Sequence, residues 1–236
     1  MKVLVTGSTQ GIGKAVAEAF VKRGDEVFVH CSKDLEKAER IRKEIGAYKA
    51  VVADLSDLKQ TESLFDKTGP VDCLILNASV QFRTPWYEIK DEEMETQLNV
   101  NFKSSFKLMQ AYYPSMKEKG FGRIVTIGSV QQYRPHKDMA IYAATKCAAM
   151  SLVENIAKQV APYGITVNNV APGIFLTPRN ARVLEDKDYR EQSQQKVPVG
   201  YFAEPKDCAG AVLLLCSEEG RYITGTEILV DGGLSL

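Results

Sequence analysis

A phenol and an ammonium group one helical turn apart are the strongest chemical signal in the sequence. Tyr142 and Lys146 are separated by three residues, so in a helix their side chains share one face. A neighbouring positive charge favours the ionised phenol, whose ordinary pKa of about 10 is too high for a base near neutral pH. The pair could therefore move a proton, with Tyr142 as general acid in one direction and general base in the other.

The same spacing occurs twice more, at residues 113–117 and 133–137. Pro114 and Pro135 lie inside those two matches, and proline disfavours an uninterrupted helical turn. Only Tyr142 and Lys146 are joined by Ala and Thr alone. We therefore predict that this third pair is the functional one.

A hydroxyl residue lies a short way upstream, where an apolar run ends. Residues 123–129 read RIVTIGS, which predicts a strand that leads to Ser129. Ligands bind at the carboxyl ends of the strands in open α/β sheets, so we expect Ser129 to lie beside Tyr142. Its hydroxyl would then hydrogen-bond a substrate oxygen on which charge develops.

A glycine-rich turn follows the first apolar run. Residues 6–13 read TGSTQGIG, and glycines there let the backbone approach a pyrophosphate and present N–H groups at a helix N-terminus. A P-loop would need glycine at position 8 and a hydroxyl residue at position 15, which are serine and alanine here. Directly after an N-terminal strand, the turn predicts dinucleotide binding. The residues expected to contact the cofactor are Gly7, Ser8, Thr9, Gln10, Gly11, Ile12 and Gly13.

The end of the second apolar run indicates which dinucleotide is bound. An acidic residue there would bind the adenosine ribose diol and repel a 2′-phosphate, but the sequence reads HCSK over residues 30–33. Ser32 could donate a hydrogen bond to the phosphate and Lys33 could pair with it. Alternatively, Ser32 caps the next helix and Lys33 is solvated. We expect NADP(H), with NAD(H) as the alternative.

The elements that must position these groups alternate along the chain. Short apolar runs predict strands, and longer segments between them predict helices. Strands that are apolar on both faces imply a parallel sheet covered on both sides, and the glycine-rich turn favours a doubly wound sheet over a (β/α)8 barrel. The predicted fold class is α/β, a single-domain Rossmann-type sheet over residues 1–236. Strands are expected at 2–6, 26–30, 50–53, 71–76, 122–127, 165–170 and 227–230, and helices at 14–23, 35–45, 58–67, 92–119, 142–161 and 205–216.

Composition and charge exclude several function classes. The chain has 236 residues, with 30 Lys+Arg and 30 Asp+Glu, so its formal net charge is zero. Zero net charge speaks against nucleic acid or an anionic membrane as a partner, and no apolar run approaches the roughly 20 residues of a membrane helix. The five cysteines lack metal-ligand spacing, and the first residues do not resemble a signal peptide. We expect buried free thiols, no metal site and a cytoplasmic protein.

The motifs taken together resemble the short-chain dehydrogenase/reductase family over nearly the whole chain. Within that family the sequence is most similar to the 3-oxoacyl-carrier-protein reductase and sugar or polyol dehydrogenase branch. Two residues depart from the family pattern: Ser79 replaces a glycine of the NNAG motif, and Gln10 stands where NADP-preferring relatives often carry Arg or Lys. The resemblance rests on the turn at 6–13, Asp54, Asn77-Ala78, Asn101, Ser129, Tyr142, Lys146, Pro172-Gly173 and residues 222–233, YITGTEILVDGG.

The resemblance implies an NAD(P)(H)-dependent oxidoreductase that interconverts a carbonyl and a secondary alcohol. It implies that Lys146 also holds the nicotinamide ribose and that Asn101 positions a water molecule in a proton relay. Because the family is usually tetrameric through its two long helices, we expect a homotetramer built on residues 92–119 and 142–161. Further cofactor contacts fall to Asp54 and Leu55 at the adenine, Asn77 and Ala78 at the adenosine ribose, Ser79, Pro172 and Gly173, and Ile174 and Thr177 at the carboxamide.

The segments expected around the reacting groups are polar. Gln131 and Arg134 lie in the loop between Ser129 and Tyr142, and Arg179 lies in residues 178–200, where relatives carry a mobile lid. We hypothesise a small polar substrate such as a sugar, polyol or oxo-acid, whose carboxylate or phosphate could pair with Arg83, Arg134 or Arg179. Two alternatives remain: 3-oxoacyl-carrier-protein reduction in fatty-acid synthesis, and a catalytically silent nucleotide-binding regulator on the same fold.

Overall fold

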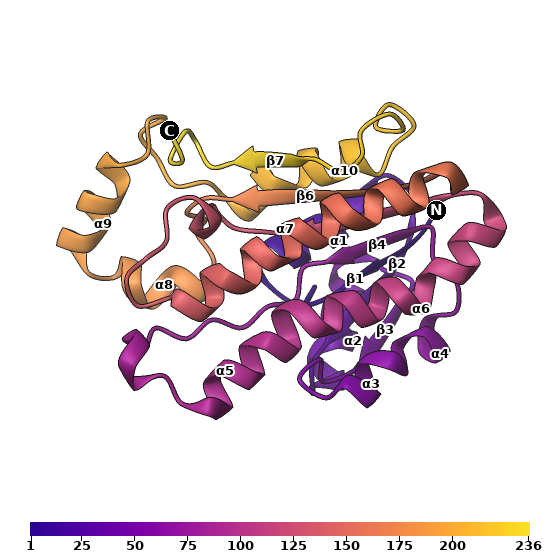
Figure 1. Ribbon diagram of the computed structural model, residues 1–236, viewed down its shortest axis with the longest axis horizontal. Helices are drawn as coiled ribbons and strands as arrows, with labels where there is room; N and C mark the ends of the chain where they lie inside the picture. Colours follow the sequence, from indigo (N-terminus) through magenta and orange to yellow (C-terminus); the bar gives the residue numbers. More distant parts are fainter.

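Seven parallel strands form one sheet in the order β3-β2-β1-β4-β5-β6-β7 (Figure 1). The computed structural model describes residues 1–236. The chain runs outward from β1 to β3, returns to β4 on the other side of β1 and continues to β7, so the winding direction reverses beside β1. The predicted doubly wound fold is confirmed. The strands are β1 (Lys2–Val5), β2 (Glu26–Cys31), β3 (Lys49–Val52), β4 (Cys73–Leu76), β5 (Gly122–Ile127), β6 (Ile165–Pro172) and β7 (Glu227–Val230).

Helices cover both faces of the sheet and form two hydrophobic cores. On one face α1 (Gly11–Lys22) and α10 (Ala209–Leu215) pack on the strands through residues such as Phe20 and Val212. On the other face α6 (Ser104–Lys119) and α7 (Ala140–Val160) pack through Tyr112 and Val153. The remaining helices are α2 (Leu35–Ile45), α3 (Leu58–Glu62), α4 (Leu64–Thr68), α5 (Asp91–Leu98), α8 (Pro178–Leu184) and α9 (Lys187–Gln195).

Three helices expected to be continuous are interrupted. The segment 58–67 is two short helices that meet at Ser63, whose hydroxyl donates to the Gln60 carbonyl at 2.8 Å and so competes with helical bonding. The segment 205–216 begins as a 3-10 turn, Pro205–Cys208, before α10. A π-helical turn, Asn99–Lys103, joins α5 to α6.

Helix α6 continues through Pro114. The argument that this proline interrupts the 113–117 turn is therefore wrong. A proline inside a helix costs about 3 kcal/mol, but α6 buries Leu108, Tyr112 and Met116 against the sheet, which offsets that cost. Location is what separates the candidate pairs, because only Tyr142 and Lys146 line the cavity at the carboxyl edge of the sheet.

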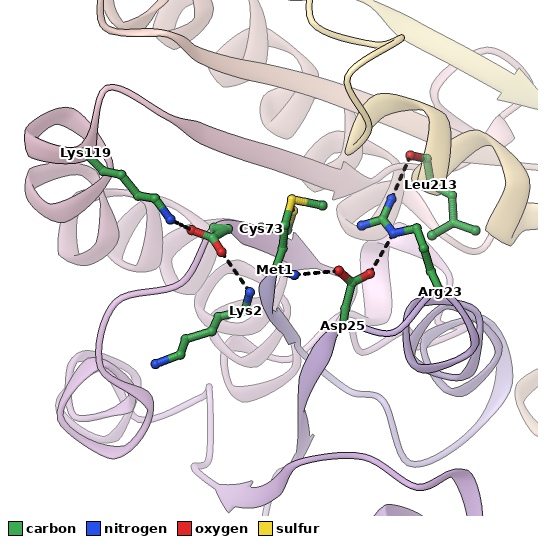
Figure 2. A network of polar contacts seen from close by, with 8 residues as sticks. Met1, Lys2, Arg23, Asp25, Cys73, Lys119 and Leu213 are labelled. Atoms are coloured by element: carbon green, nitrogen blue, oxygen red, sulfur yellow. Dashed lines mark hydrogen bonds and ion pairs between the residues drawn. The ribbon is translucent and has the colours of Figure 1, made fainter.

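Ion pairs fix the amino ends of β1 and its neighbours (Figure 2). The amino group of Met1 lies 2.8 Å from Asp25, whose other oxygen accepts from Arg23 at 2.7 Å. The backbone N–H of Lys2 donates to Asp72 at 2.8 Å, and Lys119 pairs with the same carboxylate. All strands are parallel, so these contacts hold the sheet at the edge opposite the glycine-rich turn.

All five cysteines are free, and four of them are buried. Cys147 is the exception to the expectation of buried thiols, because it lies on the exposed face of α7. None of the helices combines the length and the apolar character that crossing a membrane requires.

Candidate active site

A cavity of about 580 Å³ lies along the carboxyl edge of the sheet. Its walls come from the segments that follow β1, β2, β3, β4, β5 and β6, together with α8 and α9. Figure 1 shows α8 and α9 beyond the carboxyl ends of β6 and β7. Residues far apart in the sequence therefore meet in one hollow, as expected for a doubly wound sheet.

The glycine-rich turn forms a wall of the cavity at the N-terminus of α1. Gly7 and Gly11 have φ of +65° and +56°, a conformation that favours glycine. A Cβ on Gly13 would lie 2.3 Å from Asn77 Nδ2, and that amide nitrogen donates to the Thr6 carbonyl at 2.8 Å. The first turn of α1 has no acidic residue and presents free N–H groups. These features fit a bound pyrophosphate.

Ser8 does not line this cavity. Its side chain is fully buried, and its hydroxyl accepts a 2.9 Å hydrogen bond from the N–H of His30. The Ser8 N–H in turn donates to the His30 carbonyl at 3.1 Å. Ser8 was expected to contact the cofactor, but its side chain lies away from the cavity and joins the turn to β2.

His30 is a site residue that the sequence did not single out as functional. Its ring is 1% exposed, and Nδ1 accepts the Gly7 N–H at 3.0 Å. The protonated Nε2 therefore donates to the Ala53 carbonyl at 3.0 Å. Burial lowers the pKa of His30 to about 4, so the ring is neutral at pH 7 and ties the cofactor turn to β2 and β3.

Two lysines lie at the end of the cavity formed by β2 and β3. Lys33 Nζ is 3.1 Å from Asp54, and Lys37 Nζ donates to Gln10 at 2.9 Å. Burial raises the pKa of Asp54, but hydrogen bonds from Ser56 and the nearby Lys33 lower it on balance. Asp34 caps α2, so Ser32 is not the cap and lines the cavity with both lysines. The sequence did not identify Lys37 as a site residue, because a lysine in the first turn of α2 gives no local signal that its side chain points back to Gln10.

Tyr142, Lys146 and Ser129 meet at the other end of the cavity. The side chains of Tyr142 and Lys146 are 5% and 4% exposed on the first turns of α7, as their spacing predicted. Lys146 Nζ lies 5.5 Å from the Tyr142 ring centroid and donates to the Ile127 carbonyl at 2.6 Å. This ammonium group is thus fixed beside the phenol.

The electrostatic environment favours an ionised phenol. Burial raises the pKa of Tyr142, but the charges of Lys146 and Arg179 and a hydrogen bond from Ser129 outweigh it and lower that pKa on balance. Burial also lowers the pKa of Lys146, against the opposing effect of Tyr142. The pair can therefore transfer a proton at a pH closer to neutral than either side chain could in free solution.

Hydrogen bonds through Gln132 link Ser129 to Glu227 on β7. The Ser129 N–H donates to Gln132 Oε1 at 2.9 Å, and the Ser129 hydroxyl accepts from the Gln131 N–H at 3.2 Å. Gln132 Nε2 donates to Glu227 at 2.9 Å. The contact spans 95 residues of sequence, so no local pattern could have revealed it.

Asn101 lies behind the cavity rather than on its wall. It is buried in the π-helical turn, where Oδ1 accepts the Val80 N–H at 2.8 Å. Its amide nitrogen donates to the Val80 carbonyl at 2.9 Å and to Thr145 at 3.2 Å. The side chain joins the loop after β4 to the helix that carries Tyr142 and Lys146.

Arg134 also lies outside the cavity, and its guanidinium contacts the carbonyl of Leu236. The expectation that Arg134 binds substrate is therefore not supported by its position. No group of three or more His, Cys, Asp and Glu side chains is placed to hold a metal ion. The other expected site residues line the cavity: Gly7, Thr9, Gln10, Gly11, Ile12, Gly13, Ser32, Lys33, Asp54, Leu55, Asn77, Ala78, Ser79, Ser129, Gln131, Tyr142, Lys146, Pro172, Gly173, Ile174, Thr177 and Arg179.

Polar groups surround the end of the cavity near Tyr142. Arg179 Nη2 on α8 donates to the Ser79 carbonyl at 2.6 Å and to the Ser79 hydroxyl at 2.9 Å. Gln131 Oε1 accepts the His136 N–H at 2.6 Å. Arg83 lies 5.8 Å from the ring centroid of Tyr189, a residue of α9.

A family model described as enoyl-(acyl carrier protein) reductase matches residues 7–235 of the chain. A 3-oxoacyl-[acyl-carrier-protein] reductase of Haemophilus influenzae is 38% identical over an alignment of 239 positions, which covers 99% of this chain and 97% of that protein. The chain is thus similar to curated reductases over almost its full length.

Two solved structures are also similar over nearly the whole chain. A 3-oxoacyl (acyl-carrier-protein) reductase from Agrobacterium tumefaciens with NADP bound is 33% identical, with a TM-score of 0.91, and the match covers 98% of this chain and 93% of that one. A gluconate 5-dehydrogenase from Burkholderia cenocepacia in complex with NADP and tartrate is 30% identical, with a TM-score of 0.92, covering 99% and 94%.

Proposed function

Because the chain belongs to the short-chain dehydrogenase/reductase family, we propose that it is an NADP(H)-dependent oxidoreductase that interconverts a carbonyl and a secondary alcohol on a small polar substrate. One observation carries this proposal. The buried Ser129, Tyr142 and Lys146 lie at one end of a cavity whose wall also contains the glycine-rich N-terminus of α1. A dinucleotide bound along that wall would end beside the proton donor.

Cofactor binding falls to residues at two places in the cavity. The turn at Gly7, Gly11 and Gly13 would hold the pyrophosphate. Lys33 and Lys37 favour NADP(H), because two ammonium groups near Ser32 can pair with a 2′-phosphate. Both solved relatives described above contain NADP, which supports the same choice over NAD(H).

A bound nicotinamide would supply or accept the hydride. In reduction, Tyr142 Oη donates a proton to the substrate oxygen as negative charge develops there, and in oxidation the phenolate accepts it. Lys146 stabilises the phenolate, because its ammonium group is fixed by the Ile127 carbonyl beside the ring. Ser129 donates a hydrogen bond to the same substrate oxygen.

Asn101 has a positioning role in this proposal. Its side-chain hydrogen bonds to Val80 and Thr145 are already made, so it fixes the loop after β4 against α7. The resemblance to the family assigns it a water molecule in a proton relay past Lys146, and the π-helical turn at this position supports a specialised role.

Polar lining residues support a sugar, polyol or oxo-acid as substrate. Gln131, His136 and Arg179 line the end of the cavity near Tyr142 beside apolar residues such as Met139 and Leu184, and their polar groups can bind the hydroxyl or carboxylate groups of such a substrate. Residues 178–200, which include α8 and α9, would close over this substrate as a lid, because Arg179 and Tyr189 reach the cavity from them.

Reduction of 3-oxoacyl groups on a carrier protein is the second candidate. It is favoured by the similarity to the Haemophilus influenzae reductase. Against it, Lys119 is engaged by Asp72 at the opposite edge of the sheet and Lys117 lies over the Tyr163 ring. These two lysines are therefore not placed to guide an acidic carrier protein to the cavity.

A substrate panel tests the proposal. NADPH oxidation is followed with a short 3-oxoacyl thioester, a keto-sugar and a series of oxo-acids. We expect turnover with a polar carbonyl. Turnover confined to the thioester would favour the second candidate, and the absence of turnover with every carbonyl, while NADPH still binds, would contradict an oxidoreductase and favour a silent regulator.

We propose a homotetramer and a reducing, cytoplasmic environment. The exposed face of α7 carries small residues, among them Ala144, Cys147 and Ser151, which suit close helix packing between subunits. Free thiols on all five cysteines favour a reducing compartment. Light scattering that gives the mass of a monomer would contradict the assembly.

A further inference from the structure

The end of the cavity near Tyr142 contains positive charge without an acidic partner. Asp54 is the single acidic residue on the cavity wall, and it lies at the opposite end with Lys33. Arg83 and Arg179 line the Tyr142 end and take part in no ion pair with an acidic residue. The positive charge at this end is therefore available to a ligand.

Arg179 is exposed, but hydrogen bonds hold its guanidinium in place. Its Nη2 makes two hydrogen bonds to Ser79, one to the carbonyl at 2.6 Å and one to the hydroxyl at 2.9 Å. Ser79 stands where the family motif has a glycine, which could not supply the second bond. A guanidinium has five N–H donors, so the N–H groups on Nε and Nη1 remain for another acceptor.

The position of Arg179 relative to Tyr142 limits what that acceptor can be. Arg179 and Tyr142 line the same cavity, and the positive charge of Arg179 is close enough to help lower the pKa of Tyr142. A substrate carbonyl must contact the Tyr142 hydroxyl to receive its proton, so any group bound by Arg179 lies only a few bonds from the reacting carbon. A guanidinium pairs best with a planar carboxylate, through two parallel N–H···O bonds.

Resting on the proposed function, we infer that the substrate carries a carboxylate attached directly to the reacting carbonyl or one carbon away, and that Arg179 binds this carboxylate. The substrate is then a 2-oxo or 3-oxo acid, or the corresponding hydroxy acid. Arg83, stacked toward Tyr189 of the lid helix α9, attracts the anion at the mouth of the cavity. A 3-oxoacyl thioester has no carboxylate at this position and leaves Arg179 without a partner.

Binding of unreactive analogues tests this inference without turnover. Oxamate and malonamate carry the carboxylate directly on an amide carbonyl or one carbon away, and oxamide and malonamide are their neutral counterparts. Isothermal titration of each compound into the enzyme saturated with NADPH gives its dissociation constant. We expect at least one anion to bind more than tenfold more tightly than its neutral counterpart, and Arg179→Gln to weaken it about 10- to 100-fold.

Arg182→Gln is the matched control, because Arg182 lies on the same helix outside the cavity. It should leave anion binding unchanged. Neutral compounds that bind as tightly as the anions, wild-type protein that binds neither anion, or Arg179→Gln protein that binds like wild type would each overturn the inference.

A kinetic readout separates this inference from the proposed function. The ratio of kcat/KM for an oxo-acid to that for its methyl ester should fall about 10- to 100-fold in Arg179→Gln and stay constant in Arg182→Gln. Anion binding through Arg179 without reduction of any carbonyl would refute the proposed function and leave the anion site intact. Reduction of esters at least as efficient as that of their acids in the wild type would refute the anion site alone.

Discussion

The buried His30 makes the stability of this protein depend on pH in a way that can be calculated. Its Nδ1 accepts the Gly7 N–H and its Nε2 donates to the Ala53 carbonyl. A second ring proton would remove the acceptor for Gly7 and place a charge in a site that is 1% exposed. The test therefore lowers the pH and compares the wild-type protein with His30→Gln, whose side chain does not titrate.

The magnitude follows from the difference between the two pKa values. Burial lowers the pKa of His30 from 6.5 to about 4 in the folded state. Above pH 6.5 the ring is neutral in both states, so its full contribution is present. Below pH 6.5 the unfolded chain takes up a proton that the folded protein resists until about pH 4. The folded state therefore loses about 2 kcal/mol by about pH 5 and about 3 kcal/mol by about pH 4 from this residue.

Chemical denaturation at about pH 7 and about pH 5 measures this effect at equal protein concentration. The free energy of unfolding of the wild type should fall about 2 kcal/mol further between the two pH values than that of His30→Gln. Both proteins share the buried and exposed carboxylates, whose contribution cancels in the difference. Equal pH dependence in the two proteins would refute the neutral, hydrogen-bonded His30 described here.

Three further predictions concern the cavity. Gln132→Ala should lower kcat about tenfold with the NADPH dissociation constant unchanged, because the Ser129 N–H loses its acceptor; equal loss of NADPH affinity would point to general unfolding instead. Lys37→Gln should reduce the preference in kcat/KM for NADPH over NADH about tenfold, and an unchanged preference would show that Lys37 does not contact the 2′-phosphate. Arg179 helps to lower the pKa of Tyr142, so Arg179→Gln should move the rise of alcohol oxidation with pH to higher pH; a profile that stays in place would contradict that contact.

The positions of the strands along the chain were predictable because each strand is a short apolar run next to a turn or helix signal. Residues 227–230 and 122–127, for example, form β7 and β5 as predicted. Helix ends were less predictable where distant contacts decide them. Pro114 remains inside α6 because the helix is buried on the sheet, and Ser63 divides the segment 58–67 through a side-chain bond to its own backbone.

The sequence predicted that the proposed reacting groups lie together because their signals are local. Tyr142 and Lys146 are one turn apart, and Ser129 ends an apolar strand, so their meeting follows from the geometry of a parallel sheet. Ser8 has the same local setting as its neighbours in the turn but points to β2 instead of the cavity. Its role depends on the contact with His30, and the hydrophobic pattern of the sequence does not predict that contact.

Long-range side-chain contacts were beyond the reach of the sequence. The bonds from Gln132 to Glu227 and from Arg179 to Ser79 join residues 95 and 100 positions apart. Arg134 and Arg179 are both loop-region arginines in the sequence, yet Arg179 alone lines the cavity. Only the position of α8 distinguishes the two arginines.

The proton-transfer role of Tyr142 is the central claim, and Tyr142→Phe tests it most directly. The matched control is Tyr113→Phe, which removes the hydroxyl of another Tyr with a Lys four residues on, located outside the cavity. NADPH oxidation by a carbonyl substrate is measured together with NADPH binding. We predict that Tyr142→Phe abolishes turnover and keeps NADPH binding, while Tyr113→Phe retains wild-type turnover. Wild-type turnover in Tyr142→Phe would contradict the assignment.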